Sequence, residues 1–297
     1  MKVLVTGATG LIGTALCDAL RERDDLAIAI TRGRHGPGEL SWDPERGELE
    51  ADRLEGADAI VHLAGESIGN ARWTPETKRR ILESRTKGTT LLAKTVASLV
   101  DPPRVLVSGS AIGYYGDRGD DVLTEESVPG GGFLSDVAVR WEESVAAADQ
   151  AGIRTVRVRT GIVLAREGGA LARLLLPFKL GLGGRIGSGR QWMSWIALED
   201  EVGAILHAID HEDVIGAMNA TAPNPVTNRD FTETLGHVLN RPTKVPTPLT
   251  ALKLRYGDEL VRELLCSSQR VEPRVLHETG YTFRHPRLAD ALHAALA

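Results

Sequence analysis

The stretch that decides the fold is Lys2-Val-Leu-Val-Thr-Gly-Ala-Thr-Gly-Leu-Ile-Gly13, at the start of a 297-residue chain. Residues 2–6 form a short β-branched, apolar run that predicts a buried strand. The apolar spacing of residues 11–23 predicts a helix directly afterwards. Between them the glycines have a GxxGxxG spacing. Such glycines permit a tight turn, let backbone N–H groups approach a pyrophosphate, and let the helix pack closely on the strand. We therefore expect residues 6–13 to bind a dinucleotide.

The alternation of strand and helix continues along the chain. Further buried strands are expected at residues 26–31, 59–63, 104–108 and 154–160, and further helices at residues 74–100 and 133–151. Thr74 and Pro75 have the residue types that start a helix. Strands and helices at this spacing form crossover units, so the fold class is α/β, a Rossmann-type doubly wound parallel sheet. We assign residues 1–165 to this dinucleotide-binding domain.

The second half of the chain has a different rhythm. Glycine and proline clusters interrupt the alternation after about residue 164. Helices are expected at residues 228–239, 248–256, 258–266 and 286–296. Residues 166–297 are therefore predicted to form a smaller, mostly helical C-terminal domain that contributes to the substrate site. Within it, a segment near residues 195–222 is expected to return to the large sheet, starting with Trp195 to Asp210.

The composition excludes several classes of protein. The net charge of −5 argues against a nucleic-acid binder, whose surface is usually basic. Cys17 and Cys266 are too few for a disulfide framework and suit a reducing cytoplasm. No apolar run approaches the ~18 residues of a membrane-spanning helix, and glycines interrupt the N-terminal run too early for a signal peptide. We expect a cytoplasmic protein that binds neither nucleic acid nor membrane.

The end of the second expected strand selects the cofactor. A site for NAD places an acidic residue there, about 20 residues after the glycines, to bind the ribose 2′-hydroxyl. Here Thr31-Arg32 is followed by Arg34, and no Asp or Glu occurs between Asp25 and Glu39. Because a guanidinium matches a 2′-phosphate, we predict NADP(H) as the cofactor, with NAD(H) less favoured. The alternative is that Arg32 only ends a solvated strand.

Several segments resemble the extended short-chain dehydrogenase/reductases, the NAD(P)-dependent epimerase/dehydratase superfamily. They are Thr6–Gly13, Asp58–Gly65, Ser108–Tyr114, Arg159–Leu164, and Gly187–Gln191 with Trp195–Asp200. In this resemblance the second segment is a strand that ends in a cofactor loop, and the fourth is a strand beside the nicotinamide. The predicted cofactor-binding residues are Gly7, Thr9, Gly10, Leu11, Ile12, Gly13, Thr31, Arg32, Leu63, Ala64, Gly65 and Arg159.

A narrower resemblance, to an epimerase-like subgroup, covers the whole chain. It rests on Glu66, Arg72–Thr74, Gly113–Gly116, Trp141–Glu142 and Gly187–Trp192. Members of this subgroup carry a short C-terminal domain of unknown function, which residues 269–273 and 280–283 resemble. The resemblance implies a small-molecule substrate without naming it.

The superfamily's catalytic Tyr-x-x-x-Lys pair is absent from this sequence. In that pair the lysine lowers the pKa of the tyrosine, so that the phenol passes a proton during hydride transfer. The residues four positions after the four tyrosines are Arg118, Gly119, Leu260 and His285. Aligning Glu142 with the acidic residue that often ends the family's helix places Leu134 and Ala138 at the Tyr and Lys positions. Standard dehydrogenase chemistry therefore needs other groups.

Ser110 and Tyr114 are the leading candidates for the catalytic role. Ser110 keeps the family's serine position and would hydrogen-bond a substrate carbonyl, or else it only lines the cofactor. Tyr114 or Tyr115 would donate a proton, or else would pack in the core with its hydroxyl satisfied. The first role requires a cation such as Arg72 or Lys78 to lower the pKa of the phenol.

Residues 65–69 match GxSxG, the nucleophile-elbow pattern of serine hydrolases. An elbow needs a helix directly after Ser67, but the next expected helix begins near Thr74. A serine hydrolase is therefore a remote alternative. The neighbouring Glu66 is a third catalytic candidate: it would act as a base if desolvated, or else would be a solvated loop residue.

Two further patterns have structural explanations. His207 and His211 have the i, i+4 spacing of metal ligands on a helix, but no third ligand is evident, so no metal is expected. The apolar stretch 174–178 would line a cleft, form a dimer contact or simply pack, and a homodimer is a possible assembly.

The leading functional hypothesis is an NADP-dependent oxidoreductase or epimerase that acts on an unknown small molecule without the usual catalytic pair. The alternative, favoured by the absence of that pair, is a sensor or scaffold that holds NADP(H) without turnover.

Overall fold

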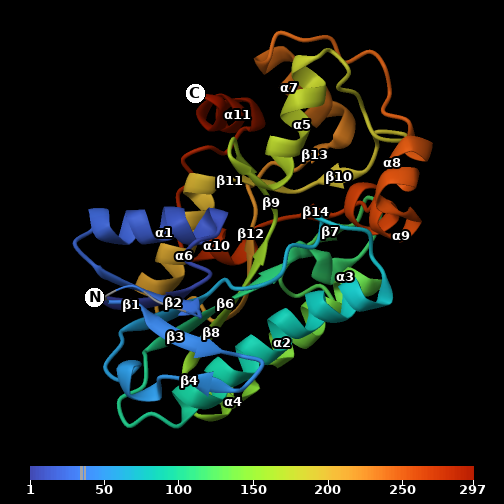
Figure 1. Cartoon of the computed structure of the whole chain (residues 1–297). Coiled ribbons are helices and arrows are strands. Elements are labelled where there is room, and N and C mark those ends of the chain that lie inside the picture. The colour runs from blue at the N-terminus through green and yellow to red at the C-terminus, as the bar shows by residue number, and fades with distance from the viewer. Residues whose placement is uncertain (34–35, 37) are drawn as a thin grey trace.

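The computed structural model describes residues 1–33, 36 and 38–297 and is built around one large sheet (Figure 1). Its eight strands have the order β12-β8-β6-β5-β1-β2-β3-β4. Their bounds are β1 Lys2–Thr6, β2 Leu26–Arg32, β3 Leu40–Asp43, β4 Glu48–Leu49, β5 Ala59–His62, β6 Val105–Ala111, β8 Arg154–Thr160 and β12 Gly216–Ala220. Neighbouring strands pair in parallel, except that β4 is antiparallel to β3. The predicted Rossmann-type parallel sheet is therefore confirmed.

The direction of winding reverses at β1. This strand pairs with β2 on one side and with β5 on the other, although β5 comes later in the chain. Sheets wound in both directions from a central strand leave a crevice at the carboxyl ends of the strands, and ligands bind there. The glycine loop after Thr6 and the segment after His62 both lie at this edge.

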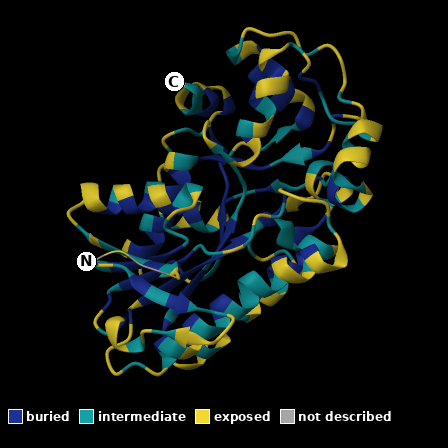
Figure 2. Cartoon of the chain, in the orientation of Figure 1, coloured by how far each residue is buried: buried dark blue, intermediate teal, exposed yellow. Residues whose placement is uncertain are grey.

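Helices cover both faces of the sheet because its strands are apolar on both sides. The helices are α1 Leu11–Glu22, α2 Pro75–Ala97, α3 Phe133–Glu143, α4 Ala146–Gln150 and α6 Leu198–Asp210. In β1, Val3 and Val5 pack into the core beneath α1 and α6, whereas Leu4 packs into the opposite core with α2. Period-two alternation thus supplies both layers from one short strand. Figure 2 shows the strands as the buried centre between the two helical layers.

The remaining elements form a smaller lobe beside the sheet (Figure 1). They include β9 Ile162–Ala165, α5 Gly169–Lys179, β10 Trp192–Met193, β11 Trp195–Ala197, β13 Val226–Thr227, α7 Asn228–Val238, α8 Leu249–Tyr256, α9 Asp258–Leu260, the π-helical turn η3 Val261–Leu265, β14 Arg270–Val271, α10 Arg274–Glu278 and α11 Leu288–Leu296. One core joins α5, α7 and α11 around Trp195 and Phe231. Leu276 of α10 lies instead in the core of the large sheet. The C-terminal segment therefore packs against both parts of the molecule.

Most predicted elements are confirmed to within a few residues. Strands 2–6 and 154–160 have the expected bounds, and the hydroxyl of Thr74 caps α2 by accepting the Thr77 N–H. The predicted helix 133–151 is instead two helices, α3 and α4, separated by Ser144 and Val145, of which Val145 is buried in the core beside α2. The predicted helix 258–266 is instead the short α9 followed by η3.

The return to the large sheet differs from the expectation. The segment Trp195–Asp210 does not enter it, because β11 pairs with β9 in a separate sheet and the following residues form α6. The strand that returns is β12, which lies parallel to β8 within the predicted range 195–222. The helix α5 was not predicted from the sequence. Glycines at its start and Pro177 inside it obscure the helical spacing of its apolar residues.

Within the described part of the chain, no helix has both the length and the apolar character needed to cross a bilayer.

Candidate functional site

The glycine loop is closed so tightly that side chains are excluded from it. Gly7 has φ +69°, and a Cβ there would lie 2.8 Å from the carbonyl carbon of Leu63. A Cβ on Gly13 would lie 2.2 Å from the Gly7 carbonyl oxygen, and one on Gly10 would lie 3.2 Å from it. The loop therefore brings the start of α1 against the end of β5 by backbone alone. The free N–H groups of this first helical turn form the surface that a pyrophosphate requires.

Residues at the end of β5 complete this edge. The hydroxyl of Thr6 accepts the N–H groups of Leu63 and Ala64 at 3.1 and 3.3 Å. It also bonds Nδ1 of His62 at 2.7 Å. Burial, with the nearby charge of Arg85, lowers the pKa of His62 to about 4, so the imidazole is neutral and structural. The predicted cofactor residues Leu63, Ala64 and Gly65 thus lie beside the glycine loop.

The predicted nucleotide-selecting residues lie at the same edge, at the end of β2. Arg32 is exposed there, and the Thr31 hydroxyl lies 3.5 Å from a carboxylate oxygen of Glu39. Glu39 also accepts the Gly36 N–H at 2.9 Å, so its carboxylate is engaged by its own loop. Arg34, the second basic residue of the prediction, lies outside the described residues.

Ser110 belongs to a buried polar cluster that the sequence did not reveal. Its hydroxyl donates to Oε1 of Glu142 at 2.7 Å. The guanidinium of Arg159 binds both oxygens of the same carboxylate, at 2.8 and 2.9 Å. Both charged side chains are almost fully buried. Burial opposes the charge on Arg159, but the hydrogen bonds and charge of Glu142 outweigh it and raise the pKa of Arg159.

The two tyrosines after β6 lie against the same guanidinium. The Tyr115 hydroxyl accepts from Nη1 of Arg159 at 2.9 Å and bonds Asn219 at 2.6 Å. Burial raises the pKa of Tyr115 to about 12 despite the opposing effect of Arg159, so this phenol holds its proton firmly. Tyr114 is half-buried, and Arg159 lies over its ring, 3.5 Å from the centroid. The cation beside Tyr114 is therefore Arg159.

Of the two cations expected beside Tyr114, Arg72 is exposed and Lys78 is paired elsewhere, while Arg159 has few donors left for a cofactor. Lys78 forms an ion pair with Glu259 at 2.7 Å and lies over the Phe133 ring. Nη1 of Arg159 also donates to the Glu125 carbonyl at 3.2 Å, so most of its donors are bound within the protein. The contact between Arg159 and the cofactor therefore stays a prediction, and these hydrogen bonds do not support it.

Glu66 and Ser67 follow β5 in an extended segment. Glu66 forms an ion pair with Arg80 at 3.2 Å and remains more than a third exposed. It is therefore not the desolvated base that the catalytic hypothesis requires. No helix follows Ser67 directly, since α2 begins at Pro75, and the strand–elbow–helix geometry of a serine hydrolase is absent from this described segment.

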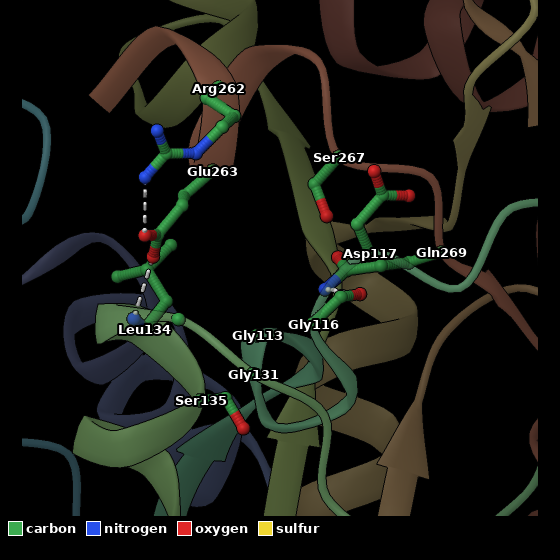
Figure 3. Close-up of a pocket in the computed structure, with 11 residues that line it drawn as sticks. Gly113, Gly116, Asp117, Gly131, Leu134, Ser135, Arg262, Glu263, Ser267 and Gln269 are labelled. Carbon is green, nitrogen blue, oxygen red and sulfur yellow. Dashed lines mark hydrogen bonds and ion pairs between the residues drawn. The ribbon is translucent and has the colours of Figure 1, made fainter. Parts of the chain in front are cut away.

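A cavity of about 260 Å³ lies between the large sheet and the C-terminal segment (Figure 3). One wall comes from the turn after β6 and the start of α3, and the other from η3 and the residues after it. The lining residues are Gly113, Gly116, Asp117, Gly131, Gly132, Leu134, Ser135, Arg262, Glu263, Ser267 and Gln269. Leu134, which stands at the expected tyrosine position, faces this cavity. Ala138, at the lysine position, is buried.

The remaining sequence patterns have structural roles. The rings of His207 and His211 stack at 3.9 Å, and His207 bonds Thr279. Within the described residues, no group of three or more His, Cys, Asp or Glu side chains is arranged to hold a metal. The stretch 174–178 lies in α5, where Leu175 and Phe178 are buried and Leu176 is exposed.

The comparisons agree with this architecture. The model of the NAD dependent epimerase/dehydratase family matches residues 3–220, and that of a domain of unknown function, DUF1731, matches residues 247–295. The chain therefore belongs to the NAD dependent epimerase/dehydratase family, with a DUF1731 domain at its C-terminal end. This confirms both resemblances seen in the sequence.

Relatives extend the match over the whole chain. The Epimerase family protein ML0860 of Mycobacterium leprae is 41% identical over 294 residues, covering 99% of this chain and 95% of the relative. The human Epimerase family protein SDR39U1 is 40% identical over 303 residues, covering both chains fully. The crystal structure of human SDR39U1 isoform 2, solved with NADPH, superposes with a TM-score of 0.92 at 37% identity and 99% coverage of each chain.

Proposed function

We propose that this protein is an NADP(H)-dependent oxidoreductase or epimerase that acts on a small molecule bound in the 260 Å³ cavity. The observation that carries the proposal is the position of this cavity. It is bordered by Leu134, where the family resemblance places the proton-transferring tyrosine, and by Gly113 in the turn after β6. A ligand there lies next to the groups that act on substrate in the resemblance.

The preference for NADP(H) rests on two observations. Arg32 is exposed at the end of β2, and human SDR39U1 is solved with NADPH. The loop around Gly7, Gly10 and Gly13 has the backbone approach that a dinucleotide needs. When bound, the nicotinamide supplies hydride chemistry, while Thr31, Arg32 and the loop hold its nucleotide. Fluorescence titrations with NADPH and NADH test this preference, and tighter NADH binding would contradict it.

Turnover itself is tested by mixing the NADPH-loaded protein with fractionated metabolites. If the reaction is a reduction, we expect one fraction to cause loss of the absorbance of NADPH. If it is an epimerisation, we expect a compound in one fraction to be converted while the amount of NADPH stays the same. If no fraction is transformed in either way, the second candidate applies.

That second candidate is an NADP(H) sensor or scaffold. Leu134 and Ala138 have no exchangeable side-chain proton, and Tyr115 is tied to Arg159 and Asn219. A sensor would change its conformation or its binding partner when NADPH binds, without consuming the NADPH. Limited proteolysis with and without NADPH would then show a difference while the cofactor is recovered intact.

We further infer a cytoplasmic location and a small-molecule substrate, in keeping with the two free cysteines and the acidic charge. A homodimer is proposed through Leu176, Leu180 and Leu182, which are all exposed. Light scattering tests the oligomeric state, and a monomer at high concentration would contradict it.

A further inference from the structure

The C-terminal segment places a carboxylate beside the position of the missing tyrosine. Oε2 of Glu263 accepts the backbone N–H of Leu134 at 3.0 Å. Gly132, the N-cap residue of α3, leaves room for it, since a Cβ there would lie 3.0 Å from Cδ of Glu263. The first N–H groups of a helix need an outside acceptor, and negative charge is favoured there. The carboxylate is thus anchored at the helix start by one oxygen.

Glu263 also lines the cavity. The side chain is only 13% exposed. Its Oε1 lies 3.5 Å from Nη2 of Arg262, which reaches it from the solvent-exposed rim (Figure 3). Both residues lie on η3, a π-helical turn, and this rare geometry occurs frequently at functional sites. One oxygen is therefore held at 3.0 Å by the backbone of α3, whereas the other has a longer contact, at 3.5 Å, with an exposed guanidinium that a donor group of a ligand can replace.

Several other wall groups present acceptors, beside the guanidinium of Arg262 and the hydroxyl of Ser267, which also line the cavity. Nε2 of Gln269 donates to the carbonyls of Ile112 and Gly116 at 3.0 and 3.1 Å, so the polar atom that remains is an acceptor oxygen. The Ser135 hydroxyl donates within its own wall, to the Tyr114 or Gly130 carbonyl. Asp117 adds a second carboxylate. Because Arg262 pairs with Glu263, the charge left over in the lining is that of Asp117. A ligand that donates hydrogen bonds complements these acceptors, whereas an anionic ligand meets a net negative charge.

The volume limits the size of the ligand. A cavity of about 150 Å³ holds a benzene ring, and drug-sized ligands occupy about 300–1,000 Å³. The 260 Å³ observed here therefore suits a single ring with a polar substituent. A nucleoside diphosphate sugar, with its base, ribose and sugar rings and its two phosphates, exceeds this space and also brings negative charge.

We propose that the cavity binds a substrate of about one ring, neutral or cationic, through a hydroxyl or amino group that donates a hydrogen bond to Oε1 of Glu263. The inference rests on the proposed function, because it takes this cavity as the substrate site. Glu263 then orients the substrate from the C-terminal domain at the point where Leu134 offers no polar group.

The test uses three probes of equal size and different charge: benzamidine, benzyl alcohol and benzoate. Their binding to the full chain is measured by calorimetry, with and without NADPH. We expect benzamidine to bind about tenfold more tightly than benzoate, because an amidinium pairs with a carboxylate. Glu263→Gln should weaken the binding of benzamidine by about tenfold. Its amide oxygen still accepts the Leu134 N–H, so the melting temperature should change little.

Matched variants locate the effect. Glu259→Gln changes a carboxylate of the same segment that pairs with Lys78, and should leave benzamidine binding unchanged. Asp117→Asn, in the opposite wall, should weaken it by less than about threefold. If Asp117→Asn has the larger effect, Glu263 is not the recognition residue and the proposal is overturned.

Three results would overturn the proposal: benzoate binding as tightly as benzamidine, an unaltered affinity in Glu263→Gln, or displacement of benzamidine by UDP-glucose. The NADPH titration of the wild-type protein is scored separately. Failure to bind NADPH contradicts the proposed function, whereas the benzamidine result reports on Glu263 whether or not NADPH binds.

Discussion

The edge that carries the glycine loop and the cavity beside Leu134 are built in opposite ways. At the glycine-loop edge, Gly7, Gly10 and Gly13 bring backbone against backbone within one short stretch. At the cavity, side chains from distant parts of the chain meet, as when Glu263 contacts Leu134 across 129 positions. The first surface is defined by the absence of side chains and the second by their identity.

Under the proposed function, the difference separates binding of the dinucleotide from the chemistry done on it. A backbone cradle works with any neighbouring side chains, so it is retained here with the family's spacing. A side-chain site changes with single substitutions, and here Leu134 and Ala138 stand where the resemblance expects Tyr and Lys. The following predictions test whether the two regions are as independent as this contrast implies.

The largest effect is expected from Glu142→Ala, on the side-chain-built side of the molecule. The change leaves Arg159 as an uncompensated buried charge, which should cost about 3–5 kcal/mol of unfolding free energy. Urea denaturation measures this loss. The double variant Glu142→Gln with Arg159→Met should recover much of it. If Glu142→Ala lowers the unfolding free energy by less than about 1 kcal/mol, the Glu142–Arg159 pair behaves like a solvent-exposed ion pair and the prediction is wrong.

The next largest effect is expected from Gly13→Ala in the backbone cradle. The new Cβ would lie 2.2 Å from the Gly7 carbonyl oxygen, so the loop must shift. Overpacking of this kind costs about 1–3 kcal/mol, and NADPH affinity should fall by at least about tenfold. The control is Gly131→Ala, because a Cβ there meets no atom within 4 Å. Normal NADPH binding by Gly13→Ala would show that the glycine loop tolerates a side chain, and would contradict the contrast between the two regions.

A pH effect is expected from Glu201, which is fully buried in α6 and accepts the Thr160 hydroxyl at 2.7 Å. Burial raises the pKa of Glu201 to about 8. Between the ordinary carboxyl pKa and this value, only the folded state holds the proton. Stability should therefore fall as pH rises through that window, by about 1.4 kcal/mol per pH unit.

Glu201→Gln removes this dependence, because the amide stays neutral. Its stability relative to the wild type should increase steadily from about pH 5 to about pH 8. Thermal unfolding across this range measures the difference. Parallel curves for the two proteins would show that Glu201 is already ionised in the fold.

The smallest effect is expected from Arg32→Ala. Loss of the guanidinium at the 2′-phosphate should weaken NADPH binding by about tenfold and leave NADH binding unchanged. Arg46→Ala, an exposed arginine near the β3–β4 turn, serves as the control. An equal loss for both cofactors would mean that Arg32 acts through the fold rather than through the phosphate.

The sequence predicted the glycine-loop edge well, because the signals for its strand, loop and helix are local. The strand, the glycine spacing and the helix lie within residues 2–23, and each follows from short-range sterics. The Ser110–Glu142–Arg159 cluster could not be predicted in the same way. Its members come from β6, β8 and α3: the pairing of β6 with β8 places Ser110 beside Arg159, and the packing of α3 adds Glu142.

By itself, the sequence determined the parallel Rossmann-type sheet, the glycine loop, the family and the absence of the Tyr-x-x-x-Lys pair. These depend on periodicity, glycine geometry and residue identity, which can be read along one strand or helix. The tertiary structure alone decided that β12 is the returning strand, that Arg159 binds Glu142, and that Glu263 stands beside Leu134. These contacts join residues from distant parts of the chain, so they form only when the sheet and the C-terminal segment have packed together.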